Sequence, residues 1–119
     1  MSDEDFKKMV ATMVPYMMIS KEKQTTVIDW MVQSDRETYV YGYTDFLRLD
    51  LREDIAKIKT PVTILAATHP YGKQVVQKNY EGQYKNLPSY DIIYAEESAH
   101  FIMCDQPEWF LNQVKEQLK

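Results

Sequence analysis

The stretch "LREDIAKIKTPVTILAAT", residues 51–68, decides the fold class of this 119-residue chain. A polar lead-in with helical spacing ends at Thr60 and Pro61, and the apolar run Val62–Ala67 follows it. This run is continuously apolar rather than alternating, which is typical of a parallel strand that is covered on both faces. It therefore predicts a buried strand at residues 62–67 and an α/β protein.

The residues after this strand predict a second strand, parallel to the first. Residues 73–86 carry apolar side chains at helical spacing, and "DIIYA", residues 91–95, indicates a short strand. A strand, a helix and a strand in this order favour parallel pairing with a right-handed crossover. A last helix is predicted from "DQPEWF", with Asp105 as its N-cap and Pro107 in its first turn.

The beginning of the chain predicts helices only. Ser2 followed by three acidic residues is a good helix start, and apolar residues recur at helical spacing after it. Pro15 interrupts this pattern, so we expect the helix to kink or end near Val14. Two further helices are predicted at residues 22–33 and 37–47.

The sequence supplies too few strands for a complete sheet. Residues 1–49 form a helical segment, and residues 50–119 form a strand–helix–strand–helix segment. Two parallel strands do not make a stable sheet by themselves, because their faces and free edges need further strands beside them. We therefore expect the end of a larger α/β domain whose central strands lie on another segment.

Composition excludes several classes of protein. A net charge of −4 and a pI near 5.1 disfavour a nucleic acid or an anionic membrane as partner. The acidic start is not a signal peptide, and no apolar run approaches the roughly 20 residues that cross a bilayer. The single cysteine, Cys104, rules out an internal disulfide framework and fits a reducing compartment. We expect a soluble protein of the cytoplasm.

Cofactor and metal sites are not predicted either. The chain has only three glycines, and none stands in a phosphate-binding loop motif. His69, His100, Cys104 and Asp105 do not have the spacing of a zinc site. The sequence therefore predicts neither a cofactor nor a metal ion.

Residues 50–118 resemble the C-terminal portion of the α/β-hydrolase superfamily. The similar stretches are "DLREDIAKIKTPVTIL", the helix after it, and "YDIIYAEESAHFIMCDQPEWFLNQVKEQL". In that family the first leads into the penultimate strand, and the last holds the final strand, the loop of the catalytic histidine and the closing helix. Residues 1–49 resemble the helical cap that many members insert. The resemblance implies an incomplete α/β-hydrolase-like fold.

The resemblance places His100 at the position of the general base. In such enzymes a serine attacks the acyl carbon, and the histidine removes its proton and later activates water. Histidine suits this role because its side chain ordinarily titrates near neutral pH. Ser98 and Ala99 are small, which would let the loop pass close to a nucleophile. The alternative that stays open is a polar residue that merely ends a strand.

Other parts of the implied catalytic site are missing. The chain has no G-x-S-x-G elbow, which the family places upstream together with the oxyanion hole. The acid expected after the penultimate strand falls in "THPYG", residues 68–72, where no carboxylate occurs. Either an earlier strand supplies this acid or the triad is incomplete. Asp45 and Asp50 could be proposed as substitutes, although Asp50 is expected to cap or brace the "DLRED" turn instead. We therefore predict that the chain alone is inactive.

The implied activity is hydrolysis of a small ester, lactone or other acyl substrate. Apolar side chains of the cap would line the acyl pocket of the enzyme, and His69 would lie nearby. These cap residues are Met13, Met17, Trp30, Tyr43 and Phe46. The alternative is that they simply form the core of the helices. The partner would be the N-terminal half of the hydrolase domain or a second copy of the chain. The alternative is a non-catalytic hydrolase-like fragment that serves as an interaction or oligomerisation module.

Overall fold

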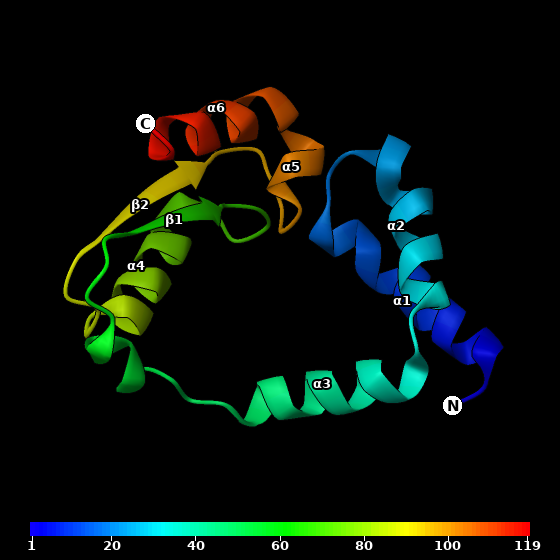
Figure 1. Cartoon of the computed structure of the whole chain (residues 1–119). Helices are drawn as coiled ribbons and strands as arrows, with labels where there is room; N and C mark the ends of the chain where they lie inside the picture. Colours follow the sequence, from blue (N-terminus) through cyan, green and yellow to red (C-terminus); the bar gives the residue numbers. More distant parts are fainter.

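The computed structural model describes residues 1–119 as a mixed α/β chain with six α-helices, one 3-10 helix and one two-stranded sheet (Figure 1). In chain order the elements are α1 (Asp3–Met17), α2 (Lys21–Gln33), α3 (Arg36–Arg48), the 3-10 helix η1 (Asp54–Lys57), β1 (Val62–Ala67), α4 (Lys73–Tyr84), β2 (Tyr90–Ala95), α5 (Ile102–Asp105) and α6 (Pro107–Gln117). None of the helices combines the length and the apolar character that crossing a membrane requires.

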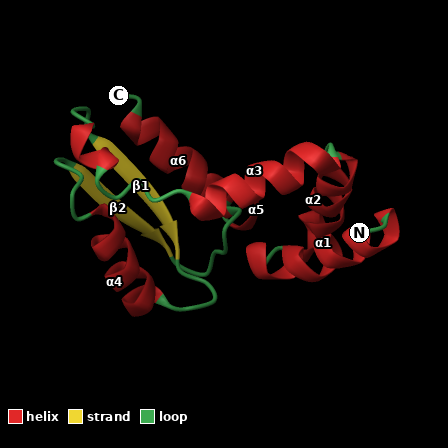
Figure 2. Ribbon diagram, turned by 90° about the horizontal axis from the view of Figure 1, so that it is seen from below, coloured by secondary structure: helices red, strands yellow, loops and turns green.

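The two strands are parallel, as predicted. Val62 lies opposite Tyr90 and Ala67 lies opposite Ala95. Helices α4 and α6 lie on opposite faces of the sheet (Figure 2). The Thr63 hydroxyl donates a hydrogen bond of 2.7 Å to the side-chain carbonyl of Gln117, which ties α6 to β1. The predicted strand–helix–strand–helix order is thus confirmed, and β1 has the predicted bounds.

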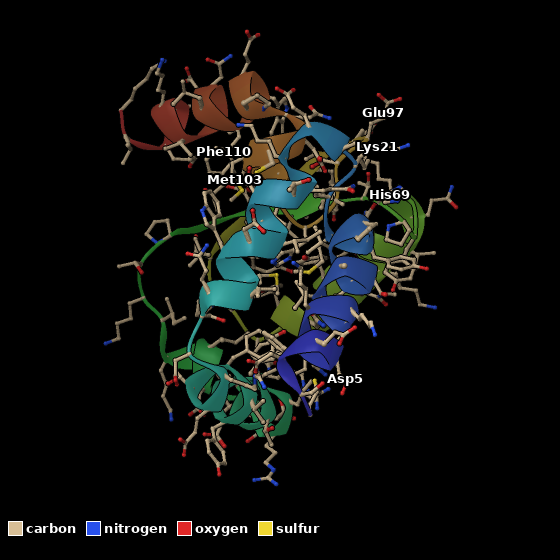
Figure 3. All side chains as sticks on the ribbon, turned by 90° about the vertical axis from the view of Figure 1, so that its right-hand side faces the viewer. Asp5, Lys21, His69, Glu97, Met103 and Phe110 are labelled. Carbon is tan, nitrogen blue, oxygen red and sulfur yellow. The ribbon has the colours of Figure 1, made fainter.

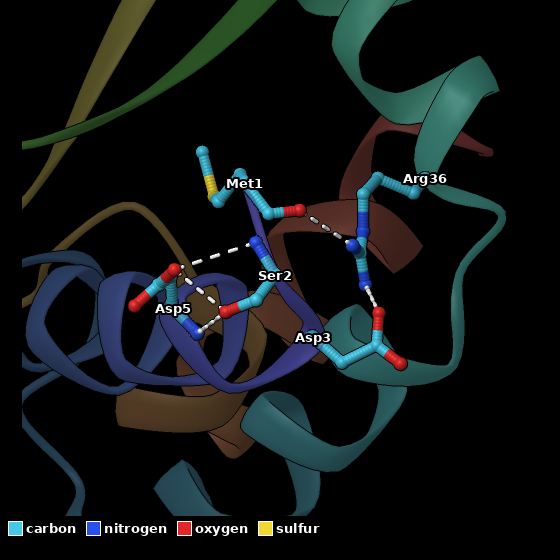
Figure 4. A network of polar contacts seen from close by, with 5 residues as sticks. All are labelled: Met1, Ser2, Asp3, Asp5 and Arg36. Carbon is cyan, nitrogen blue, oxygen red and sulfur yellow. Dashed lines mark hydrogen bonds and ion pairs between the residues drawn. The ribbon is translucent and has the colours of Figure 1, made fainter.

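Helix α1 begins where the sequence predicts. The backbone N–H of Asp5 donates to the Ser2 hydroxyl at 3.1 Å, and the Ser2 N–H donates back to the Asp5 carboxylate at 3.3 Å (Figure 4). These two bonds satisfy amide groups that the first turn of a helix leaves without partners. The hydrogen bond of the Ser2 hydroxyl to Asp5 also lowers the pKa of the Asp5 carboxyl.

Of the two outcomes expected from Pro15, a kink or an end near Val14, the end is wrong. Helix α1 continues through Pro15 to Met17, and the Met18 N–H donates to the Val14 carbonyl at 3.1 Å. Pro15 lies in the last turn, and its side chain is exposed. A proline there removes only one backbone hydrogen bond near the end of the helix, so the helix tolerates it.

The main core lies between α1 and α2. It consists of five buried apolar side chains, Phe6, Val10, Val14, Met18 and Val27. Partly buried side chains from other elements pack against it, among them Tyr39 of α3 together with Phe101 and Cys104 at α5. The helical segment therefore packs directly against the loop and helix that follow β2.

The chain is more open than a closed monomer of its size. Only 13 of its 119 residues are buried, and its accessible surface is 8995 Å². A compact protein of 14.1 kDa exposes roughly 6,700 Å², about 2,300 Å² less. Its radius of gyration is 16.3 Å, against roughly 13.5 Å for a compact domain of this length. Such a surplus is what a sheet with missing strands would leave.

Candidate functional site

His100 lies on the loop after β2, beside the loop that follows β1. The His69 N–H donates to the Ser98 carbonyl at 3.0 Å and joins the two loops. Figure 3 shows His69 and Glu97 on these neighbouring loops. Because the carboxyl ends of parallel strands meet at one edge of a sheet, residues 69 and 100 come together although 31 positions separate them. Both histidines line one pocket of about 450 Å³.

The walls of this pocket come from three parts of the chain. Tyr16 belongs to the last turn of α1, Val76 and Tyr80 belong to α4, and the histidines belong to the strand-end loops. Burial raises the pKa of the Tyr80 phenol, and the charge of neighbouring Tyr84 adds to this effect. The polar groups that line the pocket are imidazoles, phenols and amides, and none is a carboxylate. No other part of the chain therefore brings a carboxylate to this pocket.

The loop that carries His100 has a fixed backbone. Ser98 and Ala99 are completely buried, and Glu97 adopts a left-handed conformation with φ of 56°. The His100 side chain is exposed, and its ring stands edge-on to that of Phe101 with centroids 5.1 Å apart. The loop thus presents an accessible imidazole from a packed backbone.

Asp105 holds this loop against the helical segment. One carboxylate oxygen accepts hydrogen bonds from the N–H groups of Ile19 (2.9 Å) and Ser20 (2.8 Å). The other oxygen accepts from the Ala99 N–H at 2.8 Å. The prediction that Asp105 caps the last helix is therefore wrong: Gln106 occupies the N-cap position of α6 and makes no side-chain cap bond.

A second hydrogen bond strengthens this junction. The Phe101 N–H donates to the Met17 carbonyl, at the end of α1, at 3.0 Å. The backbone on both sides of His100 is consequently bonded, directly or through Asp105, to residues 17–20 of the helical segment. The position of His100 therefore depends on the end of α1 as much as on the sheet.

Glu96, which directly follows β2, is committed to another partner. Glu96 forms an ion pair with Lys73, whose Nζ lies 2.9 Å from Glu96 Oε1. The hydrogen bond from Lys73, together with its positive charge, lowers the pKa of the Glu96 carboxyl. The Lys73 ammonium also lies 5.7 Å from the centre of the Tyr94 ring. Glu96 does not line the pocket of His100.

Most of the residues proposed to bind substrate do not line the pocket of His100. Met13 and Met17 are half-buried on α1, while Tyr43 and Phe46 are exposed on α3. Trp30 lines a different cavity of about 640 Å³ together with Phe101 and Cys104. Of the six proposed substrate residues only His69 shares a pocket with His100. Sequence reasoning did not propose Tyr16 or Tyr80 for this site.

Asp45 and Asp50 also lie outside the pocket of His100. Asp50 accepts hydrogen bonds from the Arg52 side chain at 2.7 Å and from the Arg52 N–H at 3.2 Å. It braces the turn before η1 and lines a cavity with Leu49 and Tyr84. Neither aspartate substitutes for the missing acid within this chain.

The contact between Asp50 and Arg52 predicts a low pKa for the Asp50 carboxyl. The hydrogen bonds from Arg52, assisted by its charge, lower the pKa of Asp50 from 3.8 to about 2. Because the pKa of Asp50 is lower in the folded chain than in the unfolded chain, ionised Asp50 stabilises the fold through its contact with Arg52. This stabilisation is present above pH 4 and is lost as the pH falls toward 2. Carbon-detected NMR of the carboxyl should show this low pKa, and Arg52→Ala should return it toward 3.8. An unchanged pKa in the variant would contradict the assignment to Arg52.

Comparison of the chain with protein-family models, with curated proteins and with solved structures found no match. No group of three or more His, Cys, Asp or Glu side chains is arranged to hold a metal ion. The proposal for function therefore rests on the sequence resemblance and on the geometry around His100.

Proposed function

We propose that this chain is the C-terminal, histidine-bearing part of a serine-type α/β-hydrolase that acts on a small ester, lactone or other acyl substrate. The observation that supports it best is the placement of His100 at the carboxyl ends of two parallel strands. There its loop is packed while its imidazole is exposed in a pocket. This is where open α/β sheets bind their ligands.

In this proposal His100 is the general base. It takes the proton of a serine hydroxyl as the oxygen attacks the acyl carbon, and it gives this proton to the leaving alkoxide as the ester bond breaks. It then takes a proton from the water that attacks the acyl-enzyme and returns it to the serine oxygen as the acid is released. His69, in the same pocket, contacts the substrate. The N-terminal half of the hydrolase domain supplies the serine, the oxyanion hole and the strands that the sheet lacks. The acid that would orient His100 also comes from that half.

We expect the chain alone to be inactive toward p-nitrophenyl acetate. It has no serine elbow and no oxyanion hole, so the hydrolysis rate should equal that of the His100→Ala variant measured beside it. Release of p-nitrophenolate is followed by its absorbance. A burst that depends on His100 in the isolated chain would show that the nucleophile lies within these residues, contrary to the proposal.

The positive test adds the missing half. A polypeptide that carries the upstream strands and a G-x-S-x-G elbow, co-expressed with this chain, should form a complex that hydrolyses the ester. His100→Ala should abolish turnover, and His69→Ala should mainly raise KM. Turnover that survives His100→Ala would overturn the role of this histidine.

A second candidate function is a non-catalytic, hydrolase-like module for interaction or oligomerisation. It is favoured by the absence of any carboxylate from the pocket and by the surplus of exposed surface. The same co-expression distinguishes the two functions. A complex that forms but never turns over substrate, with or without His100, would support the interaction module instead.

A further inference from the structure

The pocket that His69 and His100 share has no wall with a fixed charge. Its ten lining residues include no Asp, Glu, Lys or Arg, although these four types make up 27% of the chain. By contrast, the cavity around Trp30 is lined by Lys23, and the cavity around Asp50 is lined by Arg52. A ligand in the pocket of His100 therefore meets neither a carboxylate nor an ammonium or guanidinium group of this chain.

The polar side chains of this pocket are not committed to other residues. They are two imidazoles, three phenols and two carboxamides, from His69, His100, Tyr16, Tyr71, Tyr80, Asn79 and Gln83. None of the seven forms a side-chain hydrogen bond with another residue of the chain. All three kinds of group can donate a hydrogen bond and also accept one. These groups are therefore available to the oxygen atoms of an uncharged ligand.

Aromatic rings form half of the lining of the pocket. Five of its ten residues are tyrosines or histidines. Tyr16 and Tyr71 are 70% and 72% exposed, and neither contacts another aromatic ring of the chain. Aromatic rings attract one another in offset-stacked and edge-to-face arrangements. The rings of Tyr16 and Tyr71 can therefore pack against an aromatic ring of a ligand.

We propose that this pocket binds uncharged aromatic esters, so that an aryl ring forms part of the substrate. The pocket lies at the carboxyl ends of two parallel strands, where open α/β sheets bind their ligands. Its volume of about 450 Å³ is within the range of small-molecule pockets, roughly 300 to 1,000 Å³. This inference rests on the proposed hydrolase function, because it names the substrate class of the same site.

Charged relatives of such an ester should bind less tightly. Removing an ammonium or a carboxylate from water costs free energy unless a group of opposite charge pairs with it, and the pocket offers none. Burial, together with the charge of Tyr84, raises the pKa of the Tyr80 phenol, so this group stays uncharged at pH 8. Attraction between a cation and the phenol rings offsets only part of the cost.

NMR titration of the isolated chain at pH 8 tests the class of ligand with three probes of similar size. These are methyl benzoate, which is neutral, benzoate, which is an anion, and benzylammonium, which is a cation. Methyl benzoate should shift the imidazole signals of His69 and His100 and should bind roughly tenfold more tightly than either ion. Equal or tighter binding of an ion, or shifts from methyl benzoate that spare both histidines, would overturn the proposal.

Three exposed tyrosines provide matched variants for this titration. Tyr16→Ala and Tyr71→Ala each remove a ring of the pocket and should raise the dissociation constant of methyl benzoate by roughly three- to tenfold. Tyr41→Ala is the control, because Tyr41 is 63% exposed on α3 and does not line the pocket. None of the three is buried, so a loss of folding does not explain a difference between them. An equal effect of all three would exclude the pocket rings as the contact.

Turnover by the complex with the N-terminal half separates this inference from the hydrolase function. Selective binding of methyl benzoate by the chain, without hydrolysis of any ester by the complex, would overturn the hydrolase function and support the neutral, aromatic pocket. Hydrolysis of methyl benzoate and of its 4-trimethylammonio derivative with equal kcat/KM would do the reverse. The proposed class of substrate would then be wrong, while His100 could still be the general base.

Discussion

Replacing Phe6 with alanine is expected to lower the free energy of unfolding by about 3 to 5 kcal/mol. Phe6 is 1% exposed and lies in the core between α1 and α2. Its ring also contacts Tyr39 and the Arg36 guanidinium, which are the attachments of α3 to α1. The substitution removes buried apolar area and leaves a cavity. Urea denaturation followed by circular dichroism, at one fixed protein concentration, measures the change.

Met9→Ala is the control for Phe6→Ala. Met9 is also a large apolar residue of α1, one turn farther along, but it lies at the surface and outside the core cluster. We expect its replacement to change the free energy of unfolding by no more than about 0.5 kcal/mol. Phe6→Leu keeps most of the apolar volume and should fall between the two. If Phe6→Ala and Met9→Ala had the same effect, Phe6 would not belong to the core.

The strands and their pairing were predictable because their signals are local. The apolar run Val62–Ala67 follows a proline and has no polar alternation, so its position follows from the sequence. Its predicted burial is met only at Ala66, because the other residues of β1 are half-buried in this chain. The helix between the strands then requires a parallel crossover. The meeting of His69 and His100 is a consequence of the same pairing, since both follow the carboxyl end of a strand.

The surroundings of His100 were not predictable in the same way. Tyr16 and Tyr80 line the pocket from α1 and α4. The spacing of apolar residues in the sequence does not predict how these helices are placed relative to the loop. The proposed acyl-pocket residues failed to gather there for a related reason. Helical spacing selects a face of a helix, but it does not say which neighbour that face meets, and Tyr43 and Phe46 face no neighbour in this chain.

The role of Asp105 was hidden by a stronger local signal. An acidic residue two positions before a proline favours a helix N-cap, and this is what the sequence predicts. The structure instead gives the carboxylate to three backbone N–H groups, two of which lie more than 80 residues away in sequence. These hydrogen bonds satisfy backbone N–H groups that have no partner within a helix or a strand. Three bonds to a carboxylate stabilise the fold more than one N-cap hydrogen bond would.

Asp105→Ala is accordingly expected to lower the free energy of unfolding by about 3 kcal/mol. The variant leaves the N–H groups of Ile19, Ser20 and Ala99 without their acceptor. Hydrogen bonds to a carboxylate contribute about 1.5 to 3 kcal/mol each, and the partial exposure of this site to water reduces their sum. Urea denaturation measures the loss. Asp29→Ala, which removes an exposed acid of α2, should leave stability nearly unchanged.

Hydrogen exchange separates a bridging role of Asp105 from a general loss of stability. Because one carboxylate serves both segments, its removal should speed exchange at the amides of Ile19, Ser20 and Ala99 together, while the β1–β2 amides stay protected. Asp105→Asn keeps one acceptor oxygen and should release only one of the two segments. If Ala99 loosened while the amides of Ile19 and Ser20 kept their protection, the helical segment would not be held through Asp105. The position of His100 would then be set by the sheet and not by the end of α1.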